Sequence, residues 1–220
     1  GLLDEFLGPQ YTPMIQFSRT CPYKCSFCVS ARPGKVRAYS LDQQKEEILY
    51  LATKYKEHTY ATLMIIDENF GINKNDREIA EFVVESYQQT GYPKRLDVYL
   101  NKKFNDKTRT IAETFSKLPE FDYVLPFQTL TPKSLEMVRR KNIRMGELDE
   151  IQQWAEKHQL VVSTEFISGL PGDSVEGIMH CIDVCFHKDI NLSIAGLLMF
   201  PGIELYRKDE REKYKIKTKY

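Results

Sequence analysis

The sequence predicts an α/β fold in which parallel strands and helices alternate to form a partial, TIM-like (β/α)6 barrel. Short, apolar, β-prone runs alternate along the chain with longer segments of helical periodicity. Six strand–helix units can be counted, and repeated units of this kind form a parallel sheet with helical crossovers. A closed barrel of eight units usually requires about 250 residues, whereas this chain has 220.

The alternating segments follow one another without a low-complexity linker, so we expect one domain. Residues 1–12 are a lead-in, residues 13–200 the barrel core, and residues 201–220 a C-terminal tail. The alternating lysines at positions 213, 215, 217 and 219 of this tail are expected to be solvated. The expected strands are residues 14–18, 62–66, 95–100, 123–128, 160–167 and 192–200. The expected helices are residues 41–58, 76–89, 106–117, 132–140, 148–158 and 174–187. The chain begins without Met and ends in a basic segment, so we expect a piece of a longer protein.

Local signals support the boundaries of these elements. Ser40 has the side chain of a helix N-cap, and Gln43 stands at the capping-box position three residues later. Gly91 and Pro93 are expected to stop the second helix. The continuous apolar run at residues 62–66 is typical of a parallel strand that is buried on both faces.

Composition restricts the class of protein. Hydrophobic residues make up 42% and charged residues 28% of the chain, as in an ordinary globular domain. Lys and Arg together number 31, as do Asp and Glu, so charge does not indicate a nucleic-acid partner. No apolar run reaches the roughly 18 residues of a membrane span. Five cysteines without a secretory signal indicate the cytoplasm, and metal ligands rather than disulfides.

Three cysteines fall within eight residues, at Cys21, Cys25 and Cys28, with the spacing C-x3-C-x2-C. Thiolates are soft ligands that suit iron–sulfur clusters, zinc or copper(I). Three of them on one short loop can hold one face of a cluster and leave one metal position open for chemistry. The other two, Cys181 and Cys185, lie four residues apart in a helical segment, where free cysteines are expected to be buried in the core.

Polar or glycine-rich groups follow several of the predicted strands. In a parallel α/β barrel the active site lies at the C-terminal ends of the strands. Residues 67–69 (Asp-Glu-Asn) follow the second strand, Gln128 ends the fourth, and residues 165–172 (Glu-Phe-Ile-Ser-Gly-Leu-Pro-Gly) end the fifth. We therefore expect these groups to converge on the cysteines.

A strand followed by Cys21, Cys25, Phe27 and Cys28 resembles the radical S-adenosylmethionine superfamily, whose motif is C-x3-C-x-(aromatic)-C. The resemblance extends over about residues 10 to 205. It implies an enzyme in which a [4Fe-4S] cluster on the three cysteines reductively cleaves S-adenosylmethionine. The resulting 5′-deoxyadenosyl radical takes a hydrogen atom from a substrate, which the sequence does not identify. A reductant such as ferredoxin or flavodoxin is implied as a partner.

The same resemblance implies roles for single residues. Residues 67–69 stand where many members have Gly-Gly-Glu, which binds the amino group of the cofactor. Asp67 and Asn69 are therefore candidates, and which of the three residues makes the contact is left open. Gln128, followed twelve residues later by Arg140, resembles a Q-x12-R arrangement in which Gln touches the ribose and Arg pairs with the cofactor carboxylate.

The segment after the fifth strand resembles the part of the family that lines adenine and ribose. Glu165 is expected to reach the ribose hydroxyls and Ile167 to pack on the adenine. Gly169 and Gly172 are expected to let the backbone pass close to the ligand. No catalytic residue beyond the cluster is assigned.

A closer resemblance is to the cobalamin-binding branch of the superfamily. It rests on residues 1–7, on Asp67-Glu-Asn-Phe-Gly71 and on Gly202-Ile-Glu-Leu-Tyr206. This resemblance implies cobalamin-dependent methylation. The D-x-H-x-x-G signature of a cobalamin domain does not occur in the sequence. Either that domain lies in another part of the protein, or this chain works without it.

Two alternatives remain open. In the first, the cysteines hold structural zinc, which needs a fourth ligand that the sequence does not offer nearby. In the second, the cluster serves electron transfer or sensing, a role that usually involves a fourth cysteine.

Overall fold

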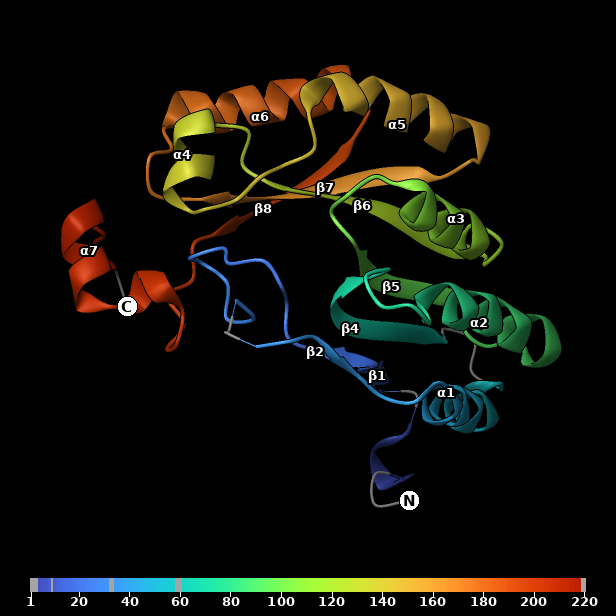
Figure 1. Ribbon diagram of the computed structural model, residues 1–220. Helices are drawn as coiled ribbons and strands as arrows, with labels where there is room; N and C mark the ends of the chain where they lie inside the picture. The colour runs from blue at the N-terminus through green and yellow to red at the C-terminus, as the bar shows by residue number, and fades with distance from the viewer. Residues whose placement is uncertain (1–3, 9, 32–33, 58–60, 219–220) are drawn as a thin grey trace. The chain divides into compact units, whose positions relative to one another are not determined.

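The computed structural model describes residues 4–8, 10–31, 34–57 and 61–218 (Figure 1). The chain divides into two compact units, which are described separately. The first unit comprises Gly1–Arg19, Arg37–Tyr123 and Gln153–Val161. The second comprises Thr20–Val36, Val124–Gln152 and Val162–Tyr220. Among the described residues, no helix is long and apolar enough to cross a bilayer.

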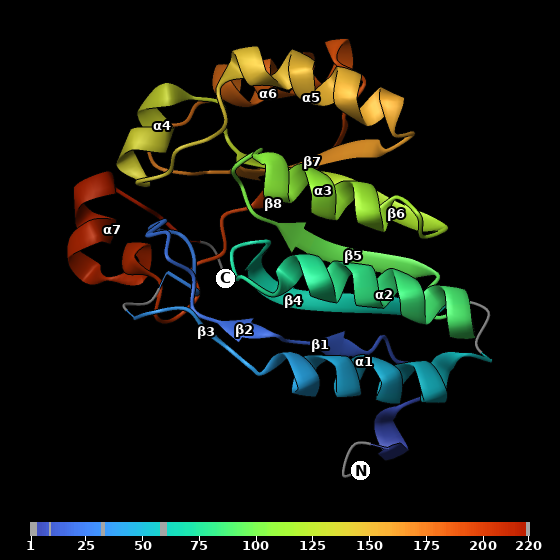
Figure 2. The ribbon, with the colours of Figure 1, turned by 45° about the vertical axis from the view of Figure 1, so that its right-hand side comes forward.

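The first unit is built on parallel strands in the order β1-β4-β5-β6. Their bounds are Met14–Ile15 for β1, Thr62–Phe70 for β4, Arg95–Leu100 for β5 and Glu120–Gln128 for β6. A short antiparallel pair is formed by β2 (Ser18–Arg19) and β3 (Arg37–Ala38). The helices are η1 (Asp4–Phe6), α1 (Leu41–Tyr55), α2 (Asp76–Thr90) and α3 (Asp106–Phe115). Figure 2 shows α1, α2 and α3 running side by side along the strands.

A row of tilted aromatic rings fills the core of this unit. The ring of Phe70 lies 6.3 Å from Phe17 and 5.8 Å from Phe115, whose ring is 5.4 Å from Phe121. Leu63 is fully buried, whereas Ile66 is 40% exposed. The prediction that this strand is buried on both faces is therefore wrong, because the helices cover one face of it and the other remains partly accessible.

The second unit continues the parallel arrangement from the end of β6 to β7 (Val161–Ser168) and β8 (Asn191–Gly196). Strand β6 and helix α5 pass from one unit to the other. The helices are α4 (Pro132–Met137), α5 (Met145–Lys157), α6 (Val175–His187), η2 (Glu204–Tyr206) and α7 (Lys208–Tyr214). In Figure 1, α6 runs along one side of β7 and β8. The predicted α/β alternation with parallel strands is confirmed.

Several predicted helix ends are confirmed by their caps. The hydroxyl of Ser40 accepts a hydrogen bond from the backbone N–H of Gln43 at 3.3 Å, as an N-cap should. The side chain of Gln43 donates to Glu47 instead of closing a capping box. Gly91 ends α2 in the left-handed conformation, at a φ of 79°.

Other boundaries differ from the prediction. The strand expected at residues 14–18 is split into β1 and β2, and residues 67–69 lie within β4 rather than after it. Helix α4 ends at Met137 because Arg139 adopts a left-handed φ of 53°, which a helix cannot continue. The C-terminal tail contains η2 and α7, and Leu205 within it is fully buried. His58, the expected end of the first helix, lies outside the described residues.

Candidate functional site

The cysteine loop, residues 21–28, is held by backbone hydrogen bonds within the second unit. The N–H of Ser26 donates to the carbonyl of Val138 at 3.1 Å, just after α4. The carbonyl of Ser26 accepts from the N–H of Leu205 in η2, also at 3.1 Å. A turn within the loop joins Cys28 N–H to the Cys25 carbonyl at 3.1 Å. Segments far apart in sequence therefore fix a loop that has no helix or strand of its own.

A cationic side chain lies against the middle thiol of this loop. Cys25 is buried, while Cys21 and Cys28 are half-buried, and none of the three is in a disulfide. The guanidinium Nη1 of Arg140 is 3.7 Å from the Cys25 sulfur. The Nε of Arg140 donates to the carbonyl of Phe127 at 3.2 Å, which fixes the guanidinium at the end of β6. The guanidinium is thus held beside the loop that carries the three thiols.

Tyr23 belongs to the same cluster of side chains. Burial raises the pKa of its phenol above the usual range, and the nearby Cys21 and Cys25 thiols act in the same direction. The Arg140 guanidinium partly offsets this rise in the Tyr23 pKa. The cysteine loop thus brings two thiols, a phenol and a guanidinium within electrostatic range of one another.

A pocket of about 310 Å³ opens beside two of the thiols. Its volume is at the lower end of the range, roughly 300–1,000 Å³, that is typical of ligand sites. Its wall consists of Cys25, Cys28, Ala31, Gly202, Ile203, Glu204, Tyr206 and Arg207. The cysteine loop therefore forms one side of the pocket, and the segment around η2 forms the other.

The donor set of the cysteine loop fits an iron–sulfur cluster. Among the described residues, no group of three His, Cys, Asp or Glu side chains is arranged to hold a single metal ion. Thiolates are soft ligands that suit iron–sulfur clusters and zinc alike. Structural zinc takes four protein ligands, whereas three thiols on one loop could hold a [4Fe-4S] cluster and leave one iron open.

Three of the predicted cofactor residues share one face of neighbouring strands. The rings of Phe127 on β6 and Phe166 on β7 stack, with centroids 6.4 Å apart and planes at 4°. Side chains alternate along a strand, so Gln128, Glu165 and Ile167 lie on the opposite face from these rings. All three are half-buried. Their placement at the C-terminal ends of β6 and β7 is what a shared ligand would require.

The backbone of Gln128 is unusual. Its φ is 69°, in the left-handed region that non-glycine residues seldom occupy. Such conformations cost of the order of 1–3 kcal/mol and cluster at functional sites. The turn at Gln128 ends β6. From there the chain continues into α4 and then to Arg140.

The loop after β7 is tied to the chain after β6 by side chains that the sequence did not single out. The carboxylate of Asp173 accepts hydrogen bonds from the hydroxyls of Thr129 at 2.9 Å and Thr131 at 2.7 Å. The amide of Asn142 donates to the Thr129 carbonyl at 2.7 Å. Asp173 directly follows the Gly-Leu-Pro-Gly turn, but its partners lie more than 40 residues away, so no local signal reveals them.

The two glycines of this loop differ in their surroundings. Gly169 has a φ of 88° and a position for a Cβ that meets only Leu197 at 3.8 Å. A Cβ on Gly172 would lie 2.5 Å from the sulfur of Met137 in α4. Gly169 therefore keeps space beside its backbone, while the close neighbour of Gly172 is α4.

Asp67 and Asn69 lie in the first unit. Asp67 is 1% exposed, and its Oδ1 accepts from the N–H of Phe17 at 2.6 Å. Its Oδ2 accepts from the hydroxyl of Ser18, and burial raises the pKa of this carboxyl. Asp67 therefore stabilises the break between β1 and β2. Asn69, two residues further along β4, is half-buried.

The loop after β4 has its own anchor, which the sequence did not indicate. The carboxylate of Asp76, at the start of α2, accepts from the N–H groups of Gly71 at 2.7 Å and Asn73 at 2.8 Å. Burial raises the pKa of Asp76 to about 6, and the nearby Lys107 acts in the opposite direction. This carboxyl fixes the segment that directly follows Asn69.

Phe27 is half-buried within the cysteine loop, and its predicted role at the cofactor stays a prediction.

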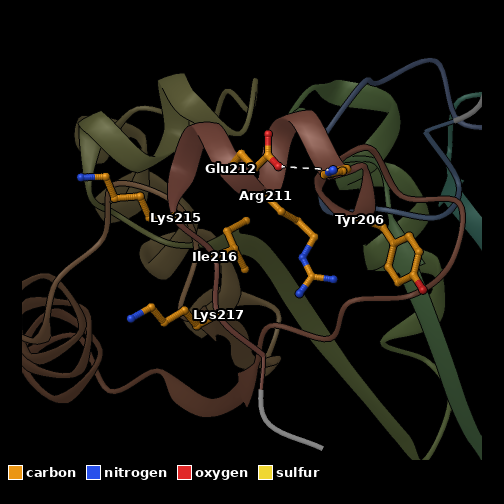
Figure 3. A pocket seen from close by; sticks show the side chains of 7 residues that line it. Tyr206, Arg211, Glu212, Lys215, Ile216 and Lys217 are labelled. Atoms are coloured by element: carbon orange, nitrogen blue, oxygen red, sulfur yellow. Dashed lines mark ion pairs between the residues drawn. The ribbon is translucent and has the colours of Figure 1, made fainter.

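A separate pocket of about 510 Å³ lies in the C-terminal tail (Figure 3). It is lined by Tyr206, Lys208, Arg211, Glu212, Lys215, Ile216 and Lys217. No predicted site residue borders it.

Comparison with known proteins found relatives but no matching family model. The chain is 29% identical over 218 residues to the cobalamin-dependent radical SAM methyltransferase TokK of Streptomyces tokunonensis, covering 96% of this chain and 31% of the relative. It is 31% identical over 196 residues to the 2-(S-pantetheinyl)-carbapenam-3-carboxylate methyltransferase of Streptantibioticus cattleyicolor, covering 86% of this chain and 28% of the relative. The chain thus spans about a third of the length of these relatives.

The fold is similar to that of a solved structure. The radical S-adenosylmethionine methyltransferase TsrM from Kitasatospora setae, with cobalamin and a [4Fe-4S] cluster bound, superposes with a TM-score of 0.68 at 18% identity. The match covers 88% of this chain and 35% of TsrM. At this identity the similarity establishes the fold.

Proposed function

From the premise that this chain belongs to the radical S-adenosylmethionine superfamily, we propose that it is the catalytic core of a radical enzyme. In this proposal Cys21, Cys25 and Cys28 hold a [4Fe-4S] cluster that leaves one iron open for S-adenosylmethionine. The observation that carries the proposal is the cysteine loop, with the Cys25 sulfur 3.7 Å from Arg140 and a pocket beside it.

When bound, the cluster and S-adenosylmethionine supply a one-electron reductive cleavage that gives methionine and a hydrogen-abstracting 5′-deoxyadenosyl radical. The chain contributes binding, orientation and the exclusion of water. Its buried thiol Cys25 and the backbone bonds of Ser26 hold the loop in one conformation.

Arg140 is the residue that we propose to bind the carboxylate of S-adenosylmethionine. A guanidinium presents several donors in a fixed plane and suits a carboxylate. Its Nε and Nη2 donate to the carbonyls of Phe127 and Pro126, which sets the plane. Nη1 is directed to the cysteine loop, the side on which the cofactor carboxylate would be bound.

The remaining cofactor contacts are assigned by position. Gln128 and Glu165 are proposed to bind the ribose, and Ile167 to pack on the adenine, because the three share one face. Gly169 is proposed to leave room for the ligand, since the space beside its backbone is open. Phe27 is proposed to pack at the cofactor within the loop.

One of Asp67, Glu68 and Asn69 is proposed to bind the amino group of S-adenosylmethionine. Asp67 is buried and accepts hydrogen bonds from Phe17 and Ser18, while Asn69 is half-buried.

We further propose that the whole protein is a cobalamin-dependent methyltransferase, with cobalamin bound outside this chain. The support is that TokK is named as such an enzyme and that TsrM was solved with cobalamin bound. The substrate is not assigned. A cytoplasmic location and a reductant such as ferredoxin or flavodoxin belong to the same proposal.

The proposal is tested by anaerobic reconstitution of the protein with iron and sulfide. We expect about four irons and four sulfides per chain, and release of 5′-deoxyadenosine and methionine after addition of dithionite and S-adenosylmethionine. The Cys25→Ser variant is the control and should give neither nucleoside nor methionine. Stoichiometric zinc without sulfide, or a cluster that never cleaves S-adenosylmethionine, would contradict the proposal and favour a structural or electron-transfer role.

A further inference from the structure

Two consecutive arginines follow α4 and contact adjacent residues of the cysteine loop. Arg140 contacts the Cys25 sulfur, as described above. The Nε of Arg139 donates to the carbonyl of Lys24, the neighbouring residue, at 3.3 Å. Arg139 has a left-handed φ of 53°. The loop is thus contacted by both arginines, at residues 24 and 25.

Arg139 also forms a two-point ion pair with Glu204 in η2. Its Nη1 lies 2.6 Å from Oε1 of Glu204, and its Nη2 contacts Oε2. The pair lowers the pKa of the Glu204 carboxyl and raises that of Arg139. Exposed ion pairs usually contribute little to the free energy of folding. Bidentate arginine–carboxylate pairs within a network are the exception. The additional bond to the Lys24 carbonyl makes this pair part of such a network.

Glu204 stands in a segment that is anchored on the cysteine loop. Its neighbours Ile203 and Leu205 are 2% and 0% exposed. The N–H of Leu205 donates to the carbonyl of Ser26, on the far side of Cys25 from Lys24. Residues 202–204 also line the pocket opposite Cys25 and Cys28. The ion pair therefore joins two walls of one pocket.

We propose that Arg139 and Glu204 form a clamp that holds residues 202–206 against the cysteine loop and shields a cluster bound there from solvent. Both are positioning residues, since they act on the thiols through the backbone of residues 24–26. The shielding rests on the proposed function, whereas the clamp itself can be tested in cluster-free protein.

The first experiment measures amide hydrogen exchange in the cluster-free protein. Glu204→Gln removes the charge but keeps the shape, and Arg139→Gly removes the side chain while relieving the left-handed backbone. We expect the amides of Ser26 and Leu205 to exchange about tenfold faster in both variants. The amides of α6 should keep their rates. The matched control is Arg144→Gln, which breaks an exposed pair with Glu147 at the start of α5.

The second experiment measures the lifetime of the reconstituted cluster in air from its visible absorption. We expect it to shorten at least threefold in Glu204→Gln and Arg139→Gly, and to remain unchanged in Arg144→Gln. Arg139→Lys, which keeps the charge without the planar fork, should restore part of the lifetime.

Unchanged exchange at Ser26 and Leu205, or equal acceleration across α6, would overturn the clamp. Faster exchange with an unchanged cluster lifetime would overturn the shielding. If the unmodified protein assembles no cluster, the shielding falls with the proposed function, and the exchange experiment still decides the clamp.

Discussion

The second unit contains two groups of cysteines that differ in their surroundings more than in their spacing. Cys25 and Cys28 line a pocket, and Arg140 lies against Cys25. Cys181 and Cys185 lie one turn apart on α6, and both are 0% exposed. Burial raises the pKa of both α6 thiols, that of Cys185 to about 11. The two groups therefore differ in what surrounds their thiols: a pocket and a cation in the loop, and the apolar core on α6.

The physical basis of the difference is the charge of the thiolate. Transfer into an apolar interior disfavours the charged form and raises the pKa of a thiol. Position on α6 supplies this condition for Cys181 and Cys185. Cys25 instead lies against the Arg140 guanidinium, and its loop is the group that we propose to bind a metal.

The largest expected effect is on cluster assembly, which should require the cysteines of the loop but not those of α6. Cys21→Ser, Cys25→Ser and Cys28→Ser should each lose cluster iron and the cleavage of S-adenosylmethionine, because a hydroxyl does not replace a thiolate ligand. Cys181→Ser should retain both. Iron analysis and product chromatography provide the measurements. The comparison fails if Cys25→Ser keeps a full cluster, or if folded Cys181→Ser loses it.

A second test compares the rates at which the thiols are alkylated in cluster-free protein. At pH 8 a thiol with a pKa near 11 is about 0.1% thiolate, against about 24% for an ordinary thiol of pKa about 8.5. Cys185 should therefore react about 200-fold more slowly than an ordinary thiol before burial is considered. Cys21 and Cys28, being half-buried, should be labelled first.

The pH dependence of alkylation provides the control. The thiolate fraction of Cys185 should rise about tenfold from pH 8 to pH 9, and its labelling rate should follow. Peptide mass spectrometry after iodoacetamide treatment resolves each site. Equal rates at Cys185 and Cys28 would remove the distinction between the groups.

A third test removes the cation from the cysteine loop. Arg140→Gln should raise the KM for S-adenosylmethionine about tenfold or more, since a charge-assisted hydrogen bond contributes roughly 1.5–3 kcal/mol. Arg140→Lys should give a smaller increase, because an ammonium lacks the planar fork. Arg144→Gln is the control for loss of charge. Unchanged KM in Arg140→Gln would show that Arg140 does not bind the carboxylate.

The smallest effect concerns stability. Cys185→Ala should cost about 1 kcal/mol near neutral pH, because it removes a buried side chain from the core. The folded-state pKa of Cys185 is raised above its usual value near 9, so its contribution is complete below that pH. It should be lost as the pH rises toward 11. Urea unfolding across this range should show a shallower decline in Cys185→Ala than in the unmodified protein.

The sequence predicted the features that depend on residues near one another in the chain. Strand β5, Arg95–Leu100, has the predicted bounds because its alternating β-prone segment is isolated between Gly91 and Pro93 on one side and a polar loop on the other. Ser40 caps α1 through a bond to a residue three positions away. The burial of Cys181 and Cys185 follows from their position one turn apart on an apolar stripe of α6.

Features caused by distant contacts could not be predicted. Asp67 is buried within β4 because its carboxylate accepts from Phe17 and Ser18, about 50 residues earlier. Asp173 bonds to threonines more than 40 residues before it. The turn at Arg139, which ends α4 early, accompanies its pairing with Glu204. These contacts determine the geometry of the candidate site. The sequence therefore indicated candidate residues for the site, but not how they are arranged.

The central claim is that the three loop thiols hold a cluster with an iron open to S-adenosylmethionine. Electron paramagnetic resonance of the dithionite-reduced protein, with and without S-adenosylmethionine, tests it most directly. The account predicts a [4Fe-4S]⁺ signal whose g-values change when S-adenosylmethionine is added, and no such signal from Cys25→Ser. A cluster signal that is identical in the presence and absence of S-adenosylmethionine would contradict it.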